Sequence, residues 1–160
     1  MNRLRDPYAR KILIVDDEVD ITTAFKLGLE EAVELQVDVY NDPLLALSNY
    51  KPGIYDLLLL DIKMPKIDGF ELYKKIQDKE TKMKDTSDND DEMPNVCFIT
   101  AYDEGYYSQF KESFPKFEKH NCFLRKPILL ADLVKKGKIT ISIDYLVEYL
   151  KEEPGTTRCC

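Results

Sequence analysis

Short apolar runs alternate along the chain with segments that have helical spacing. Residues 11–16 (KILIVD), 55–60 (YDLLLL) and 96–100 (VCFIT) are the most apolar of these runs. Runs of this kind are typical of central strands in a parallel sheet, because helices cover such strands on both faces. Residues 35–40 (LQVDVY) and 122–125 (CFLR) also favour strands. The pattern therefore predicts five strands.

The segments between the predicted strands carry the spacing of helices. Residues 17–33, 70–79 and 104–119 each place apolar side chains on one side of a helix. A further helix is predicted to begin at Asp42-Pro43, because Asp caps helix N-termini and Pro suits the first turn. Strands that alternate with helices in this way predict an α/β fold, with a doubly wound parallel sheet and right-handed crossovers.

Two segments interrupt the alternation. Residues 79–95 are polar, acidic and without periodicity, which predicts a flexible exposed loop inserted before the fourth strand. At the other end, residues 126–134 fit a fifth helix, and residues 141–150 fit that pattern again. Either a short fifth helix is followed by an extra C-terminal helix, or an insertion displaces the true fifth helix to 142–151. We favour two helical pieces, and the pattern leaves open which of them packs on the sheet.

Composition and charge narrow the function classes. The chain has 160 residues, of which 44 % are hydrophobic, enough for one domain with a real core. No run approaches the roughly 20 apolar residues of a membrane span, and none resembles a signal peptide, so we expect a cytoplasmic protein without membrane insertion. The net charge of −7 argues against direct nucleic-acid binding, which needs clustered Lys and Arg.

The four cysteines do not indicate a metal or disulfide site. Their spacing fits neither a zinc site nor a disulfide framework. Cys97 and Cys122 each lie in a predicted strand, where we expect them to be buried as small hydrophobic residues. Cys159 and Cys160 end the sequence without a prenylation box of the usual form, and the sequence assigns them no role.

Polar residues follow four of the predicted strands. Asp16 and Asp17 end the first strand, Asp61 the third, Thr100 the fourth, and Lys126 comes directly after the fifth. The carboxyl ends of parallel strands meet at one edge of the sheet, where such folds bind their ligands. Three carboxylates gathered there would repel one another and raise their pKa values unless a cation lies between them. Oxygen ligands of this kind favour Mg²⁺. Each residue alone has an ordinary structural explanation, but their joint placement predicts a site.

Four sequence motifs point to a family. ILIVDDE, LLLLDIKMPKIDGFEL, FITAY and FLRKP occur in this order between Lys11 and about Lys136, and together they resemble the receiver domains of two-component response regulators. The resemblance implies a flavodoxin-like (βα)5 fold, a five-stranded parallel sheet of order 2-1-3-4-5 with helices on both faces, here with an additional C-terminal helical segment. The organisation that we expect is an N-terminal arm (1–10), a receiver domain (11–152) with a flexible acidic insertion (79–95) and an atypical C-terminal segment (138–152), and a disordered tail (153–160).

The resemblance also implies a role for particular residues. Asp61 would be the phosphoacceptor nucleophile, and the catalytic and switch residues around it would be Thr100, Lys126 and Phe123. Thr100 and Lys126 would bind phosphoryl oxygens, and Phe123 would occupy the aromatic position that turns inward on activation. The implied Mg²⁺ ligands are Asp16, Asp17, Asp61 and the backbone carbonyl of Lys63.

The implied function is that of a phosphorylation switch. A sensor histidine kinase or a phosphotransfer protein would donate the phosphoryl group, because the only histidine, His120, precedes the fifth strand away from the site. Such a protein catalyses its own phosphorylation and a slow acyl-phosphate hydrolysis, and is not a conventional turnover enzyme. About 24 residues follow Lys136, too few for a DNA-binding domain, so we expect a stand-alone receiver that docks on an unknown protein target. A homodimer through the face of strand 4, helix 4 and strand 5 is a further expectation.

Three alternatives remain to be weighed. A receiver-like module that binds partners without phosphorylation would keep the fold, but the full set of acids with Thr100 and Lys126 counts against it. A magnesium-dependent phosphohydrolase with an Asp nucleophile commonly has a second acid two residues later, where this chain has Lys63. A flavin-binding protein of this fold would need a phosphate-cradling loop after the first strand, where two acids stand instead.

Overall fold

The structure is a computed structural model that describes residues 10–32, 35–83, 93–101, 108–109, 112 and 122–125. For a few of these only the backbone is described, namely Arg10, Glu31, Ala32, Leu35, Thr100 and residues 122–125. The N-terminal arm, both C-terminal helical segments and the tail lie outside the described residues. Of the helix expected over 104–119, only Ser108, Gln109 and Glu112 are described, and all three are helical.

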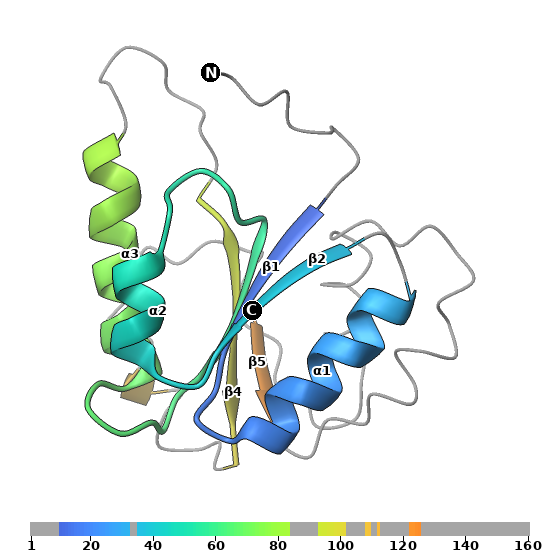
Figure 1. Cartoon of the computed structure of the whole chain (residues 1–160). Coiled ribbons are helices and arrows are strands. Elements are labelled where there is room, and N and C mark those ends of the chain that lie inside the picture. The colour runs from blue at the N-terminus through green and yellow to red at the C-terminus, as the bar shows by residue number, and fades with distance from the viewer. Residues whose placement is uncertain are drawn as a thin grey trace, which may run out of the picture.

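The centre of the fold is a parallel sheet. Its strands are β1 (Arg10–Val15), β2 (Leu35–Tyr40), β3 (Leu57–Asp61), β4 (Asn95–Thr100) and β5 (Cys122–Arg125). They lie in the order β2-β1-β3-β4-β5, and every pair of neighbours is parallel. Figure 1 shows β1 and β2 side by side. The chain moves to one side of β1 to form β2 and then crosses to the other side for β3. The strand order therefore reverses at β1 and β3, the place where doubly wound sheets bind ligands.

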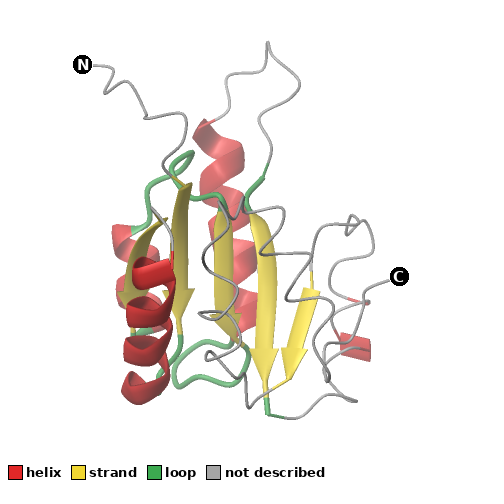
Figure 2. Cartoon of the chain, turned by 90° about the vertical axis from the view of Figure 1, so that its right-hand side faces the viewer, coloured by secondary structure: helices red, strands yellow, loops and turns green. Residues whose placement is uncertain are grey.

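Helices in the described part of the chain cover both faces of this sheet. They are α1 (Val19–Ala32), α2 (Pro43–Asn49) and α3 (Gly69–Met83). The helix α1 lies on one face, and α2 and α3 lie together on the other (Figure 2). The predicted parallel α/β fold with helices on both faces is therefore confirmed. Among the described residues, no helix has both the length and the apolar character that crossing a membrane requires.

The core explains why the central strands are so apolar. Residues 57–60 of β3 are at most 1 % exposed, because this strand lies between β1 and β4 in the middle of the sheet and α3 packs on one of its faces. On the side of α2 and α3, Leu58 and Leu60 pack with Phe70 and Ile76 of α3. The aromatic rings of Phe70 and Phe98 meet edge to face with centroids 4.9 Å apart. This packing fixes where the carboxyl ends of the strands lie.

The start of α2 follows the sequence prediction. Asp42 is the N-cap, and its carboxylate Oδ1 accepts hydrogen bonds from the N–H groups of Leu44 (2.8 Å) and Leu45 (3.3 Å). Pro43 occupies the first turn, where its missing N–H costs no hydrogen bond. A cap of this kind contributes about 1 kcal/mol to helix stability.

The end of α3 differs from the sequence prediction. The helix was expected to stop at Lys79, but it continues to Met83, so the first part of the predicted loop at 79–95 is helical. The added turn contains Glu80, which is only 5 % exposed. Its Oε1 accepts hydrogen bonds from the hydroxyl of Tyr50 (2.6 Å) and the N–H of Gly53 (3.1 Å). Periodicity missed this turn because its buried residue is a carboxylate rather than an apolar side chain.

A second difference concerns Cys97. It is fully buried in β4, as expected, but it is disulfide-bonded. The register of the sheet places Cys122 of β5 opposite it. The spacing of cysteines along the sequence carries no information about strand register, and for that reason it did not indicate a disulfide.

Candidate functional site

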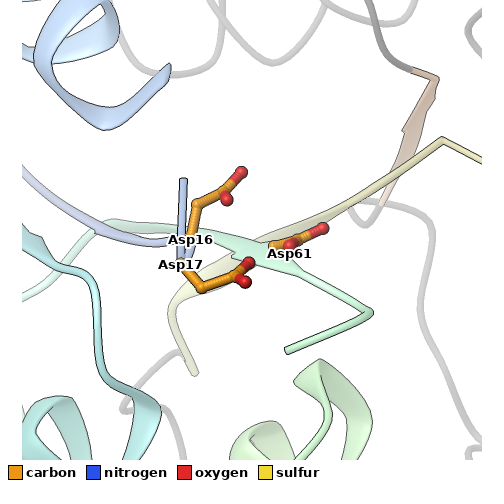
Figure 3. A group of neighbouring side chains, drawn as sticks. All are labelled: Asp16, Asp17 and Asp61. Carbon is orange, nitrogen blue, oxygen red and sulfur yellow. The ribbon is translucent and has the colours of Figure 1, made fainter. Parts of the chain in front are cut away.

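Three carboxylates meet at the carboxyl edge of the sheet. Asp16 and Asp17 directly follow β1, and Asp61 is the last residue of β3. Each offers one carboxylate oxygen such that these oxygens all lie within 4.8 Å of one another. The three side chains extend to the same side of the strand ends (Figure 3). Residues 45 positions apart in the sequence thus come together because β1 and β3 are neighbours in the sheet.

The burial of these acids is unequal. Asp16 is 0 % exposed and Asp61 is 3 % exposed, whereas Asp17 is open to solvent. Two unit charges about 4 Å apart repel by roughly 4 kcal/mol at an effective dielectric constant of about 20. Three ionised carboxylates at this spacing therefore form a strongly unfavourable arrangement that one divalent cation would relieve. Carboxylate oxygens are the hard ligands that Mg²⁺ prefers.

A set of hydrogen bonds orients the turn that carries Asp16. The Oδ1 of Asp16 accepts a hydrogen bond from the N–H of Glu18 (2.9 Å), and its own N–H donates to the carbonyl of Tyr40 in β2 (3.2 Å). The carbonyl of Asp16 accepts from the side-chain amide of Asn41 (2.8 Å), which also donates to the hydroxyl of Thr22 (2.8 Å). Motif and spacing in the sequence do not single out Asn41; its place directly after β2 at this edge is the available signal.

The backbone at Asp61 is fixed from two directions. The next residue, Ile62, donates its N–H to the carbonyl of Ile99 in β4 (2.9 Å) and accepts a hydrogen bond from the N–H of Gly69 (2.8 Å). Gly69 begins α3 so close to β3 that a Cβ there would lie 2.3 Å from the carbonyl oxygen of Asp61. Only glycine fits at this position. The motif LLLLDIKMPKIDGFEL contains this glycine, but helical periodicity alone does not explain why it is there.

An ion pair joins the loops that follow β2 and β3. The Asp42 carboxylate pairs with the ammonium group of Lys66, in the loop between β3 and α3. Hydrogen bonding to Lys66 holds the pKa of Asp42 below its ordinary value. Lys66 has a backbone φ of 75°, a left-handed conformation that costs a residue with a Cβ roughly 1–2 kcal/mol.

The other predicted site residues are described only in part. Lys63 follows the acid cluster with an exposed side chain. Thr100 ends β4, one residue beyond Ile99, the register partner of Asp61. Phe123 lies in β5 opposite Phe98. The side chains of Thr100 and Phe123, and Lys126 as a whole, lie outside the described residues. The structure thus brings the three acids together and places the backbone of Thr100 at the same edge.

Comparison with known proteins decides the family. The family profile of the response regulator receiver domain matches residues 12–137. The chain belongs to this family. The match covers every described strand beyond the first residues of β1, so the fold and the acid cluster both fall within the receiver domain.

Individual relatives agree with this assignment. The cyclic di-GMP phosphodiesterase response regulator RpfG of Xanthomonas campestris pv. campestris is 43 % identical over 67 residues, which are 41 % of this chain and 18 % of that protein. The chain spans between 18 % and 38 % of the length of three curated relatives that it matches, so those relatives are longer proteins. The shared part is a receiver domain of two-component signalling.

Solved structures agree on the fold. The chemotaxis protein CheY4 of Vibrio cholerae superposes with a TM-score of 0.60 and 21 % identity, covering 83 % of this receiver domain chain and 99 % of CheY4. The response regulator TrrA of Thermotoga maritima, solved in complex with Mg²⁺ and BeF, has a TM-score of 0.56 and 27 % identity, covering 82 % of this chain and 99 % of TrrA. The receiver therefore has the flavodoxin-like parallel α/β fold of its family.

Proposed function

We propose that this receiver accepts a phosphoryl group on Asp61 from a phosphohistidine of a sensor histidine kinase or a phosphotransfer protein, in a reaction that requires Mg²⁺. The observation that carries the proposal is the cluster of three carboxylate oxygens within 4.8 Å, with Asp61 at the end of the central strand β3. Receiver domains bind Mg²⁺ at an acidic pocket of this kind. Because phosphohistidine is made from intracellular ATP, the proposal also places the protein in the cytoplasm.

The donor set of this chain fits Mg²⁺. Asp16, Asp17 and Asp61 would hold the ion together with the backbone carbonyl of Lys63, so that all protein ligands are oxygens. When bound, Mg²⁺ supplies positive charge that offsets the negative charge on the transferring phosphoryl oxygens. The buried carboxylate of Asp16 is held by its local hydrogen bond to Glu18, which keeps one ligand oriented before the ion arrives.

The transfer itself needs a nucleophile held in line. An oxygen of the Asp61 carboxylate attacks phosphorus while the P–N bond of the phosphohistidine breaks, and the electron pair of that bond stays on the imidazole nitrogen. The product is an acyl phosphate on Asp61. The ammonium group of Lys126 and the hydroxyl of Thr100 would neutralise charge on the phosphoryl oxygens. The packing of Gly69 against the Asp61 backbone limits movement of the nucleophile.

Phosphorylation would change the conformation of the surface around β4 and β5. Thr100 at the end of β4 would move toward the phosphoryl group, and Phe123 in β5 would fill the space that it leaves. Phe123 has no hydroxyl, so this switch would depend on packing alone. The shifted face would bind a downstream protein target or a second copy of the receiver. The complete domain would add a fifth helix and a C-terminal helical segment, within the proposed bounds 11–152.

The proposal is tested by incubating the purified protein with Mg²⁺ and acetyl phosphate and measuring its intact mass. We expect one phosphoryl adduct on the wild type and on Asp78→Asn, which changes an exposed acid on α3. We expect none on Asp61→Asn and none when a chelator removes Mg²⁺. An adduct of equal extent on Asp61→Asn would overturn the assignment. No adduct on the wild type, with this donor or with a phosphorylated histidine protein, would favour the unphosphorylated binding module.

A further inference from the structure

The turn between β2 and α2 contacts the segment that carries two of the three acids. Asn41 lies in this turn, directly after the last residue of β2. We propose that Asn41 is a positioning residue for the Mg²⁺ site: it fixes the peptide group between Asp16 and Asp17 and thereby sets the directions of both carboxylates. This inference rests on the proposed function of the acid cluster.

The contact of Asn41 falls on the peptide that links the two acids. Its side-chain amide donates to the carbonyl oxygen of Asp16 at 2.8 Å. That carbonyl belongs to the planar unit joining Asp16 to Asp17. A hydrogen bond that fixes the carbonyl direction therefore fixes the orientation of the plane, and with it the ψ angle of Asp16 and the φ angle of Asp17. The relative placement of the two carboxylates depends on these angles.

The second hydrogen bond of Asn41 anchors the same amide to α1. It donates to the hydroxyl of Thr22 at 2.8 Å, and Thr22 is 1 % exposed in the first turns of that helix. The Thr22 hydroxyl in turn donates to the carbonyl of Val19 at 3.0 Å. Both hydrogens of the Asn41 amide are thus used, one on each side of the turn that carries the acids. The amide cannot rotate without losing one of the two contacts.

The pairing of β1 with β2 also helps to fix the segment that carries Asp16 and Asp17. The N–H of Asp16 donates to the carbonyl of Tyr40, the residue just before Asn41, at 3.2 Å. The β1–β2 pairing therefore continues to Asp16 itself, and Asn41 adds a side-chain bond directly after it. On the other side of Asn41, Asp42 pairs with Lys66 in the loop that follows β3. The side chain of Asp42 bonds to Lys66 and to the start of α2, whereas that of Asn41 bonds to the Asp16 carbonyl, so we assign the positioning role to Asn41 and not to Asp42.

Some residues hydrogen-bond to a metal-ligating residue without touching the metal itself. Removing such a residue commonly weakens metal affinity about tenfold or more. We therefore expect Asn41→Ala to weaken Mg²⁺ binding about tenfold. Its maximal phosphorylation rate at saturating Mg²⁺ should stay within about twofold of the wild-type rate, because the Asn41 amide bonds to the Asp16 carbonyl and the Thr22 hydroxyl rather than to the nucleophile Asp61. A role in general stability alone would lower the melting temperature and leave the Mg²⁺ dissociation constant unchanged.

The experiment measures Mg²⁺ binding to the unphosphorylated protein by calorimetry, with MgCl₂ as the only ligand. The variants are Asn41→Ala, Asn41→Ser as a milder change, and Asn49→Ala as the matched control. Asn49 is an exposed asparagine of α2 whose amide donates to the carbonyl of Leu45 at 2.9 Å, within the same helix. Circular dichroism melting curves establish that each variant is folded at the temperature of the titration.

The expected result is a weakened Mg²⁺ affinity for both Asn41 variants, larger for Ala than for Ser, and a wild-type affinity for Asn49→Ala. If the folded Asn41 variants bind Mg²⁺ as the wild type does, the positioning role is wrong and the proposed function stands. If the wild type itself does not bind Mg²⁺, the proposed function is wrong, and the positioning role that rests on it is wrong as well. A folded Asn41→Ser protein keeps the test decisive if Asn41→Ala does not fold, because equal affinity there overturns the inference.

Discussion

Gly69 and Asp61 are in such close contact that a methyl group on Gly69 would lie 2.3 Å from the Asp61 carbonyl oxygen. The helix α3 begins directly against the strand end that carries the proposed nucleophile. The N–H of Gly69 also donates to the carbonyl of Ile62 at 2.8 Å, so helix and strand end are joined by a hydrogen bond as well as by packing. The position of Asp61 therefore depends on a residue eight positions later that has no side chain.

This contact predicts the effect of Gly69→Ala. The added methyl group must displace the Asp61 backbone, which we expect to cost about 1–3 kcal/mol of unfolding free energy. We also expect phosphorylation by acetyl phosphate to slow at least tenfold, because the nucleophile moves out of line. The rate is measured at a temperature where the variant is folded.

The matched control for that variant is Gly53→Ala. Gly53 has a φ of 77°, and nothing lies within 4 Å of a Cβ there. Its replacement should lower stability by roughly 1–2 kcal/mol through the left-handed backbone alone, and the phosphorylation rate of the folded protein should not change. If both variants slow phosphorylation equally, the close contact at Gly69 has no specific role.

Lys66 provides a test of backbone strain near the site. Its φ of 75° favours glycine, whereas its exposed ion pair with Asp42 contributes no more than about 1 kcal/mol. Lys66→Ala should therefore be destabilising, since it loses the pair and keeps the strain. Lys66→Gly should be more stable than Lys66→Ala by about 1 kcal/mol. Urea denaturation of the two variants measures the difference; equal stabilities would show that the left-handed conformation is not strained.

The buried carboxylate of Glu80 is predicted to stabilise the last turn of α3. Glu80→Ala leaves the Tyr50 hydroxyl and the Gly53 N–H without their acceptor, and we expect a loss of about 2–3 kcal/mol. The exposed Glu71 of the same helix is the control, and Glu71→Ala should change stability by less than about 0.5 kcal/mol. Tyr50→Phe measured with and without Glu80→Ala isolates the hydrogen bond. Additive effects would mean that Tyr50 and Glu80 are not coupled.

The pH dependence of stability should contain a contribution from Asp38. Burial raises the pKa of this carboxyl, but hydrogen bonds from Tyr55 (2.6 Å) and Lys11 (3.0 Å) outweigh burial, and the net pKa lies below the ordinary value of 3.8. A carboxyl whose pKa is lowered by folding stabilises the protein above its unfolded pKa, and that stability is lost as the pH falls through the folded pKa.

We therefore expect the wild type to lose stability between pH 5 and pH 3 partly through Asp38. Asp38→Asn should be less stable at pH 5 and should lose less stability over the same interval. Denaturation by urea at both pH values gives the comparison, with Asp78→Asn as an exposed control that keeps the wild-type slope. An Asp38→Asn slope equal to that of the wild type would refute this contribution.

Much of the fold follows from the sequence because the central strands are buried on both faces. Residues 12–15 and 57–60 are apolar throughout, and the Asp42-Pro43 pair marks a helix start by local chemistry alone. The acid cluster was also predictable, because neighbouring parallel strands bring their carboxyl ends to one edge. The strand assignments and the residue that ends each strand are enough to predict this cluster.

The remaining features depend on contacts between distant residues. The last turn of α3 is stabilised by Glu80 meeting Tyr50, which stands 30 residues earlier, and helical periodicity does not count a buried carboxylate as a core residue. The role of Asn41 depends on where β2 ends relative to Asp16, which is a matter of strand register. The left-handed conformation of Lys66 contradicts its residue type, so no local rule indicates it.

Locating the phosphoryl group in the modified protein shows whether Asp61 is the phosphoacceptor. The protein is phosphorylated with acetyl phosphate and Mg²⁺ and then reduced with borohydride, which converts an aspartyl phosphate to homoserine, and its peptides are sequenced by mass spectrometry. We expect homoserine at position 61 and unmodified aspartate at positions 16 and 17. Homoserine at another acidic position, with intact aspartate at 61, would contradict it.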